Sequence, residues 1–201
     1  MQPYPLLLHK FTDHAAKWHG DAEIVTGGGT APATPIGYAR LRDRSVKLSA
    51  AFATLGLGQG DRIATRAWNS QAHMECWYAA PGIGVVCHTL NPRIGAAALA
   101  EMAGQAGDRL LVASPDQAAL VEELVALCTA VEHVLILDEP GAAGVPLPIV
   151  DGVRIWTQRE LIDQPATAIP WGGISTAPVW HRSSRGSKSR SRLASRPFGW
   201  V

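Results

Sequence analysis

Two short groups of residues carry side chains that could recognise a small molecule. His73 and Trp77 are four positions apart, so they share one face if their segment is helical. His88, Thr89 and Asn91 stand at the end of a predicted strand or just beyond it. Ligands of parallel sheets bind at the carboxyl ends of the strands, which makes this a natural place for a pocket. The predicted substrate-binding residues are therefore His73, Trp77, His88, Thr89 and Asn91.

The second group also has a structural explanation, which we favour over ligand binding. His88 would then hydrogen-bond to backbone in the core, and Asn91 with Pro92 would form a turn. Which role holds depends on where the side chains point, so both interpretations stay open at this stage.

Motifs for catalysis are absent or weak. The phosphate-binding pattern G-x-x-x-x-G-K-[ST] does not occur. The glycines of residues 56–60 precede a predicted strand instead of following one, which indicates a turn and not a dinucleotide site. Residues 173–177 come within one residue of the G-x-S-x-G nucleophile motif, but no strand precedes them, which favours a flexible serine. A spacing of five distributes His9, His14 and His19 around a helix, so we do not expect them to bind a metal ion together. Because the motifs are absent or weak, we predict neither a catalytic residue nor a metal ligand.

The elements that must position these residues alternate between helix and strand. The helices are amphipathic or begin at good capping residues, and the strands are short and apolar. The predicted helices cover residues 39–55, 69–78, 96–105 and 115–129, and the predicted strands cover residues 63–68, 83–90, 109–113 and 134–137. Short strand-to-helix connections require parallel pairing with crossovers, so the fold class is α/β, a parallel sheet flanked by helices. The strand positions expected to be buried are Trp68, Cys87, Leu111 and Ile136.

Peripheral segments are less regular. Residues 22–25 and 36–38 flank a Gly-, Thr- and Pro-rich stretch and form either a hairpin or a loop. Residues 155–161 have the pattern of a short strand that runs into a helix. Beyond Trp171 all periodicity is lost.

The composition divides the chain in two. It is 47% apolar and 17% charged, which is typical of a globular protein, and its net charge is +1. Residues 171–201 nevertheless hold five Arg, one Lys and no acidic residue, whereas residues 1–170 hold twelve basic and seventeen acidic residues. The Ser- and Arg-rich stretch 172–201 has too little apolar surface to offset its ordering entropy, and we expect it to be disordered.

Targeting signals are not apparent. No apolar run approaches the roughly 18 residues that a membrane-spanning helix needs. The start of the chain lacks the basic residues and the long apolar run of a signal peptide, so we expect a cytoplasmic protein. The three cysteines lack C-x-x-C spacing and are expected to be reduced thiols.

Three segments resemble the AMP-forming acyl-CoA synthetases. They are Gly-Asp-Arg with a strand and Trp-Asn at 60–69, His-Met-Glu-Cys-Trp-Tyr at 73–78, and His-Thr-Leu-Asn-Pro-Arg at 88–93. The resemblance covers about residues 3–171 and is strongest to medium- and long-chain fatty-acyl-CoA ligases, including those acting on methylthiopropionate. It implies the N-terminal part of the large domain of such enzymes. It also implies their reaction, in which ATP and magnesium activate a fatty acid as an acyl-adenylate and the acyl group passes to coenzyme A.

The resemblance ends near Trp171. Family members continue with a Thr/Ser/Gly-rich loop whose lysine holds the ATP phosphates, then with adenine and magnesium residues and a mobile C-terminal domain with a catalytic lysine. None of these follows here. We therefore expect a partial AMP-binding-type domain at 1–171 and a non-homologous tail at 172–201. The chain would then be a truncated ligase that is inactive alone. We expect it to bind no ATP, magnesium or coenzyme A. A frame change near Gly172 would explain the abrupt switch in composition.

The composition is also compatible with a second function. The alternative is a non-catalytic α/β interaction module whose basic tail contacts nucleic acid, acidic partners or a full-length ligase. Nucleic acid is disfavoured because no folded nucleic-acid motif accompanies the positive charges. The family resemblance also implies a homo-oligomer formed through the N-terminal segment.

Overall fold

The computed structural model describes residues 7–28, 31–140, 142 and 144–172. Before the central sheet come α1 (His9–Trp18), β1 (Glu23–Gly28), β2 (Ala31–Gly37) and α2 (Tyr38–Thr54). The sheet and its connections comprise β3 (Arg62–Arg66), α3 (Gln71–Gly82), β4 (Val86–Thr89), α4 (Ala96–Ala106), β5 (Asp108–Ala113), the 3-10 turn η1 (Pro115–Gln117), α5 (Ala118–Leu127), β6 (His133–Ile136), β7 (Arg154–Thr157) and α6 (Gln158–Asp163). Within this described part of the chain, every helix is too short or too polar to cross a membrane.

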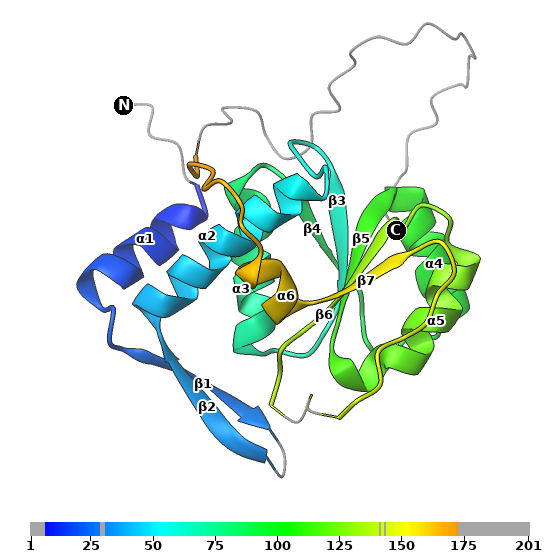
Figure 1. Ribbon diagram of the computed structural model, residues 1–201, viewed down its shortest axis with the longest axis horizontal. Helices are drawn as coiled ribbons and strands as arrows, with labels where there is room; N and C mark the ends of the chain where they lie inside the picture. Colours follow the sequence, from blue (N-terminus) through cyan, green and yellow to red (C-terminus); the bar gives the residue numbers. More distant parts are fainter. Residues whose placement is uncertain (1–6, 29–30, 141, 143, 173–201) are drawn as a thin grey trace, which may run out of the picture.

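The centre of the fold is a five-stranded sheet with strand order β4-β3-β5-β6-β7. All four strand pairs are parallel. Helices α2, α3 and α6 cover one face of the sheet, and α4 and α5 cover the other (Figure 1). The predicted α/β class, a parallel sheet flanked by helices, is confirmed.

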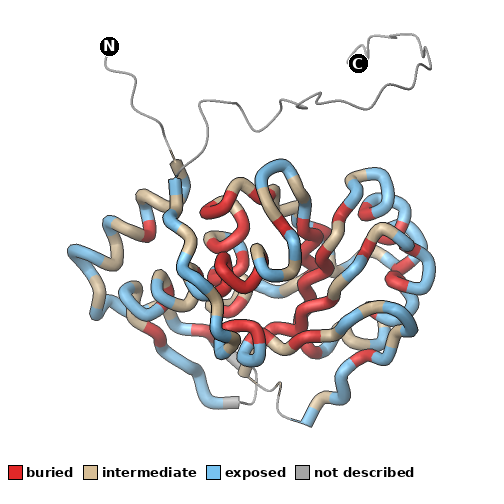
Figure 2. Tube along the Cα trace, turned by 45° about the horizontal axis from the view of Figure 1, so that its top comes forward, coloured by how far each residue is buried: buried red, intermediate tan, exposed pale blue. Residues whose placement is uncertain are grey.

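Two apolar layers follow from the strand geometry, because successive side chains point to opposite faces of a sheet. Ile63 and Leu110 pack with α2, α3 and α6, whereas Ala64 and Leu111 pack with α4 and α5. The buried residues are concentrated on the sheet and on the helix sides that face it (Figure 2). A parallel sheet is stable when both faces are covered in this way.

The boundary between α3 and β4 differs from the prediction. The helix continues past Tyr78 to Gly82, and the strand predicted from residue 83 begins only at Val86. Gly84 has a φ of 80°, which reverses the chain before the strand and interrupts any extended backbone. The apolar run 83–90 therefore contains a turn that its residue types do not reveal.

Two of the four strand positions predicted to be buried are buried in the structure. The prediction for Trp68 is wrong, because the side chain is 44% exposed. The strand β3 ends at Arg66, so Trp68 lies in the following loop, where its Nε1 donates to Asp116 at 2.9 Å. Cys87 is half-buried because β4 is an edge strand. The two positions that are buried as predicted are Leu111 and Ile136.

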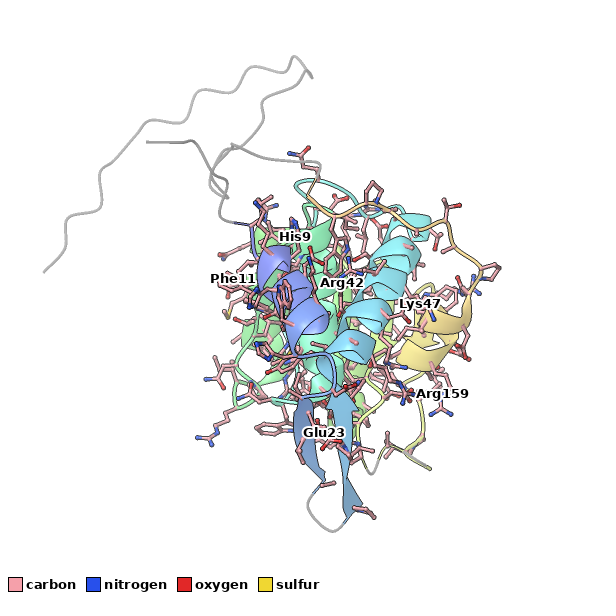
Figure 3. All side chains as sticks on the ribbon, turned by 90° about the vertical axis from the view of Figure 1, so that its left-hand side faces the viewer. His9, Phe11, Glu23, Arg42, Lys47 and Arg159 are labelled. Atoms are coloured by element: carbon pink, nitrogen blue, oxygen red, sulfur yellow. The ribbon has the colours of Figure 1, made fainter. Side chains whose placement is uncertain are left out.

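The peripheral segments are also resolved by the structure. Strands β1 and β2 form an antiparallel hairpin, which decides between hairpin and loop, and the hairpin projects from the body of the molecule (Figures 1 and 3). Strand β7 runs into α6 as predicted, and Thr157 with Glu160 forms a capping box at the start of that helix. The tail expected to be disordered lies outside the described residues, apart from Gly172.

After α6 the chain returns to α2 and α3. Trp171 Nε1 donates a hydrogen bond to Ser49 Oγ at 2.8 Å. A Cβ atom on Gly82 would lie 2.5 Å from the same indole nitrogen, so the approach of Trp171 to α3 requires glycine at that position. Trp171 thereby holds the end of the described chain against the helical layer.

We predict that Leu111→Ala lowers the free energy of unfolding by about 2 to 5 kcal/mol, because the side chain is completely buried in β5 and its removal leaves a cavity. Leu127→Ala is the matched control, since Leu127 is 57% exposed at the end of α5. Urea unfolding of both variants measures the difference. Equal effects would contradict the assignment of Leu111 to the core.

Candidate active site

A cavity of about 390 Å³ lies between the hairpin, α3 and the end of β4. His73 and Trp77 line it from α3, and Thr89 lines it from the last position of β4. Three of the five predicted substrate-binding residues therefore share one cavity. The cavity lies beside the carboxyl ends of β3 and β4, the edge at which parallel sheets bind ligands.

Ser70 determines how α3 presents its side chains. Its backbone is extended, and its Oγ accepts a hydrogen bond from the backbone N–H of His73 at 3.1 Å. This N-cap starts the helix at Gln71. His73 and Trp77 are then one turn apart on the same face, as their spacing predicts.

Burial favours the neutral form of His73. Burial lowers the pKa of its imidazole, and a backbone contact with Trp68 opposes this only in part. Its Nδ1 lies 3.1 Å from the carbonyl oxygen of Trp68, so Nδ1 carries the hydrogen in this contact. Nε2 is buried and has no protein partner among the described residues. The neutral imidazole adds no charge to the cavity and offers one unused acceptor.

The remaining cavity wall is largely apolar. Trp77 and Tyr78 stack edge to face with ring centroids 5.4 Å apart. Met74 from α3 and Val25 from β1 add aliphatic surface, and both side chains are exposed to solvent in this chain. An apolar cavity with a few polar groups at its rim suits the hydrocarbon part of a small molecule.

A hydrogen-bonded carboxylate supports the start of α3. Glu139, just after β6, accepts from Ser70 Oγ at 2.6 Å and from Ser114 Oγ at 3.1 Å. Burial raises the pKa of the Glu139 carboxyl, and the two hydroxyl donors lower it in part. The contacts join the segments that follow β3, β5 and β6. No local sequence pattern indicates Glu139, because its partners are 25 and 69 positions away.

A second carboxylate lies deeper in the same region. Glu75 is fully buried in α3, where it accepts from Arg44 Nε at 2.7 Å and from Gln158 Nε2 at 2.8 Å, and also from the side chain of Gln71. Burial raises the pKa of Glu75, and the Arg44 guanidinium opposes that rise. This network ties α2, α3 and α6 together behind the cavity wall.

The other two predicted residues lie elsewhere. His88 Nδ1 is 2.7 Å from Oδ2 of Asp108, a completely buried carboxylate whose pKa is raised by burial and lowered in part by His88. Asn91 Oδ1 accepts from the backbone N–H of Arg93 at 2.9 Å, which agrees with the turn predicted for Asn91 and Pro92. Neither residue lines the cavity.

A larger cavity of about 580 Å³ lies near the carboxyl ends of β6 and β7 and has several charged side chains in its wall. Arg40 and Arg44 line it from α2, Asp138 lines it from the segment after β6, and Arg159 lines it from α6, with Arg159 Nε 3.4 Å from Asp138 Oδ2. These residues come from distant parts of the sequence, which is why no local motif indicates them. Among the described residues, no three His, Cys, Asp or Glu side chains gather closely enough to hold a metal ion.

Comparison with known proteins identifies the family. The family model for AMP-binding enzymes matches residues 11–168. The chain is 36% identical over 171 residues to 3-methylmercaptopropionyl-CoA ligase of Ruegeria lacuscaerulensis, which covers 85% of this chain and 31% of that protein. It is 33% identical over 144 residues to a long-chain fatty acid–CoA ligase of Thermus thermophilus, covering 72% of this chain and 27% of that protein. The chain belongs to the AMP-binding enzyme family, and it spans less than a third of the length of these two ligases.

Solved structures agree on the fold. The adenylation domain of a carboxylate reductase from Mycobacterium chelonae superimposes with a TM-score of 0.67 at 16% identity, covering 85% of this chain and 31% of that one. The A-PCP didomain of the carboxylic acid reductase from Segniliparus rugosus superimposes with a TM-score of 0.63 at 18% identity, covering 84% of this chain and 28% of that one. The described residues thus share the fold of part of an adenylation domain.

We predict that Glu139→Gln makes stability less dependent on pH. The folded protein raises the pKa of Glu139 above its ordinary value of 4.5, so the carboxyl stabilises the fold fully only below that pH and loses this contribution as the pH rises through the folded pKa. The glutamine variant should therefore gain stability relative to the unmodified chain as the pH rises from 4.5 towards neutrality. Urea unfolding across that range measures the difference.

Glu123→Gln, on the exposed surface of α5, is the control for removal of one negative charge. A stability difference for Glu139→Gln that does not change with pH would contradict the effect of burial on this carboxyl.

Proposed function

We propose that this chain forms the first part of the adenylation domain of a fatty-acyl-CoA ligase, and that the cavity beside α3 receives the hydrocarbon part of the acid. The observation that carries the proposal is the gathering of His73, Trp77 and Thr89 on one apolar cavity at the carboxyl edge of the sheet. Membership of the AMP-binding family supports the reaction class. The two ligases to which the chain is similar support an acid with an alkyl chain, since both are named as CoA ligases of such acids.

The part of the reaction assigned to these residues is binding and orientation. Trp77 and Met74 would exclude water from the alkyl chain, and burial of apolar surface would supply the affinity. The neutral His73 would keep the wall free of a charge that a hydrocarbon could not solvate. The family's chemistry, adenylation of the carboxylate by ATP followed by thioester formation with coenzyme A, needs further groups that these residues do not supply.

We further propose that the 201-residue polypeptide is inactive by itself. Charge builds on the departing pyrophosphate during adenylation and must be met by cations already in place. The described lysines are Lys10, Lys17 and Lys47, and all three lie on α1 and α2. Among the described residues, no group of three or more His, Cys, Asp or Glu side chains could hold a metal ion, and no step is assigned to magnesium.

We predict that the purified polypeptide exchanges no pyrophosphate into ATP with any fatty acid of a chain-length series. The physical reason is that adenylation needs cations already placed around the departing pyrophosphate, and the lysines of the described residues all lie on α1 and α2 instead of in a phosphate-binding loop. The measurement is a carboxylate-dependent exchange assay, with a mock purification as the control for host ligases. Exchange that depends on both the polypeptide and the acid would contradict inactivity.

We predict that the polypeptide binds octanoate and that Trp77→Ala weakens this binding about tenfold, because the variant removes a large part of the apolar wall. Isothermal titration calorimetry measures the dissociation constants. Trp18→Ala is the matched control, since Trp18 is an exposed tryptophan on α1 outside the cavity and its loss should leave octanoate binding unchanged. Equal affinities for the unmodified chain and Trp77→Ala would show that octanoate does not occupy this cavity.

A further inference from the structure

The hairpin of β1 and β2 is rigid at its base. The backbone N–H of Ala39 donates to the carbonyl of Gly20 at 3.2 Å, and Tyr38 N–H donates to Ala22 at 3.1 Å. A Cβ atom on Gly37 would lie 2.6 Å from the carbonyl oxygen of Gly20, so the two ends of the hairpin meet in close backbone contact. The position of the base is therefore fixed by α1 and α2.

The distal part of the hairpin is held by much less. It extends away from the helices in two perpendicular views (Figures 1 and 3). Among the described hairpin residues, Thr26 is the one whose side chain hydrogen-bonds to the body: its Oγ1 accepts from the backbone N–H of Gln71 at 2.9 Å. Thr26 is also buried, whereas its strand neighbours Val25 and Gly27 are exposed.

The partner of Thr26 is the first residue of α3. A helix leaves its first N–H groups without partners inside the helix, and here Thr26 satisfies the N–H of Gln71 from a distant part of the chain. The same hairpin strand supplies three consecutive cavity-lining residues, Ile24, Val25 and Thr26. One hydrogen bond therefore joins the hairpin wall of the cavity to the helix that carries His73 and Trp77.

We propose that the β1–β2 hairpin is a hinged wall of the cavity and that Thr26 latches this wall onto the start of α3. This inference rests on the proposed binding of an acyl chain in the same cavity. An alkyl chain that touches both α3 and β1 favours the closed wall, and the closed wall in turn raises affinity for the chain, because the two equilibria are linked. Thr26 is thus a positioning residue and not a catalytic one.

The test compares three variants of the full polypeptide. Thr26→Val keeps the shape of the side chain but loses the acceptor, and Thr26→Ser keeps the acceptor. Thr34→Val makes the same chemical change at the residue paired with Thr26 on β2, where the side chain is exposed. Octanoate affinity is measured by calorimetry, and amide hydrogen exchange of residues 23–28 is measured by mass spectrometry with and without octanoate.

For Thr26→Val we expect octanoate binding about three- to tenfold weaker and hairpin exchange faster by a similar factor, the loss expected for one hydrogen bond. Octanoate should slow the exchange of residues 23–28 in the unmodified chain. Thr26→Ser and Thr34→Val should match the unmodified chain in both measurements. Hairpin exchange in Thr26→Val equal to that of the unmodified chain would overturn the latch.

The two proposals fail separately. If the unmodified chain does not bind octanoate, the proposed acyl site fails, and the coupling between ligand and wall fails with it. The exchange of Thr26→Val without ligand still decides whether the latch exists. If octanoate binds and Thr26→Val exchanges faster at the hairpin but binds with unchanged affinity, the acyl site stands and the coupling is overturned.

Discussion

Parallel pairing of the five strands is the constraint on which the rest of this structure depends. Each parallel neighbour requires a crossover, and the crossovers place helices on both faces of the sheet. The carboxyl ends of all the strands then meet at one edge, where the connecting loops turn into helices or irregular segments. Ser70, Ser114 and Glu139 are brought together at that edge although they follow three different strands.

Buried carboxylates convert this arrangement into a defined helix position. Glu139 binds the hydroxyl of Ser70, which caps α3, while Glu75 in the same helix is held by Arg44 and Gln158. Burying such charges is unfavourable unless they are paired and hydrogen-bonded, so loss of one partner would leave a costly unpaired group. The networks therefore restrict α3 to one orientation, and with it the face that lines the apolar cavity.

The cavity itself arises where two structural units meet. The helix and sheet edge provide one side, and the hairpin, which is outside the main sheet, provides the other. A wall built from a projecting hairpin has few buried contacts and is open to adjustment, whereas the wall built from α3 is rigid. The proposed roles follow this division: α3 supplies the recognition surface, and the hairpin supplies closure through Thr26.

Local patterns in the sequence determined the alternation of strands and helices and the parallel class of the sheet. They also determined that His73 and Trp77 lie on one face of a helix, because periodicity and capping act over a few residues. The family resemblance was visible in the same segments. The tertiary structure alone decided that His88 pairs with Asp108 and that Trp68 is exposed, since both depend on where a strand ends and what lies beside it. It also decided the contacts of Thr26 and Glu139, whose partners are 25 to 69 positions away and are brought close only when the sheet and hairpin pack.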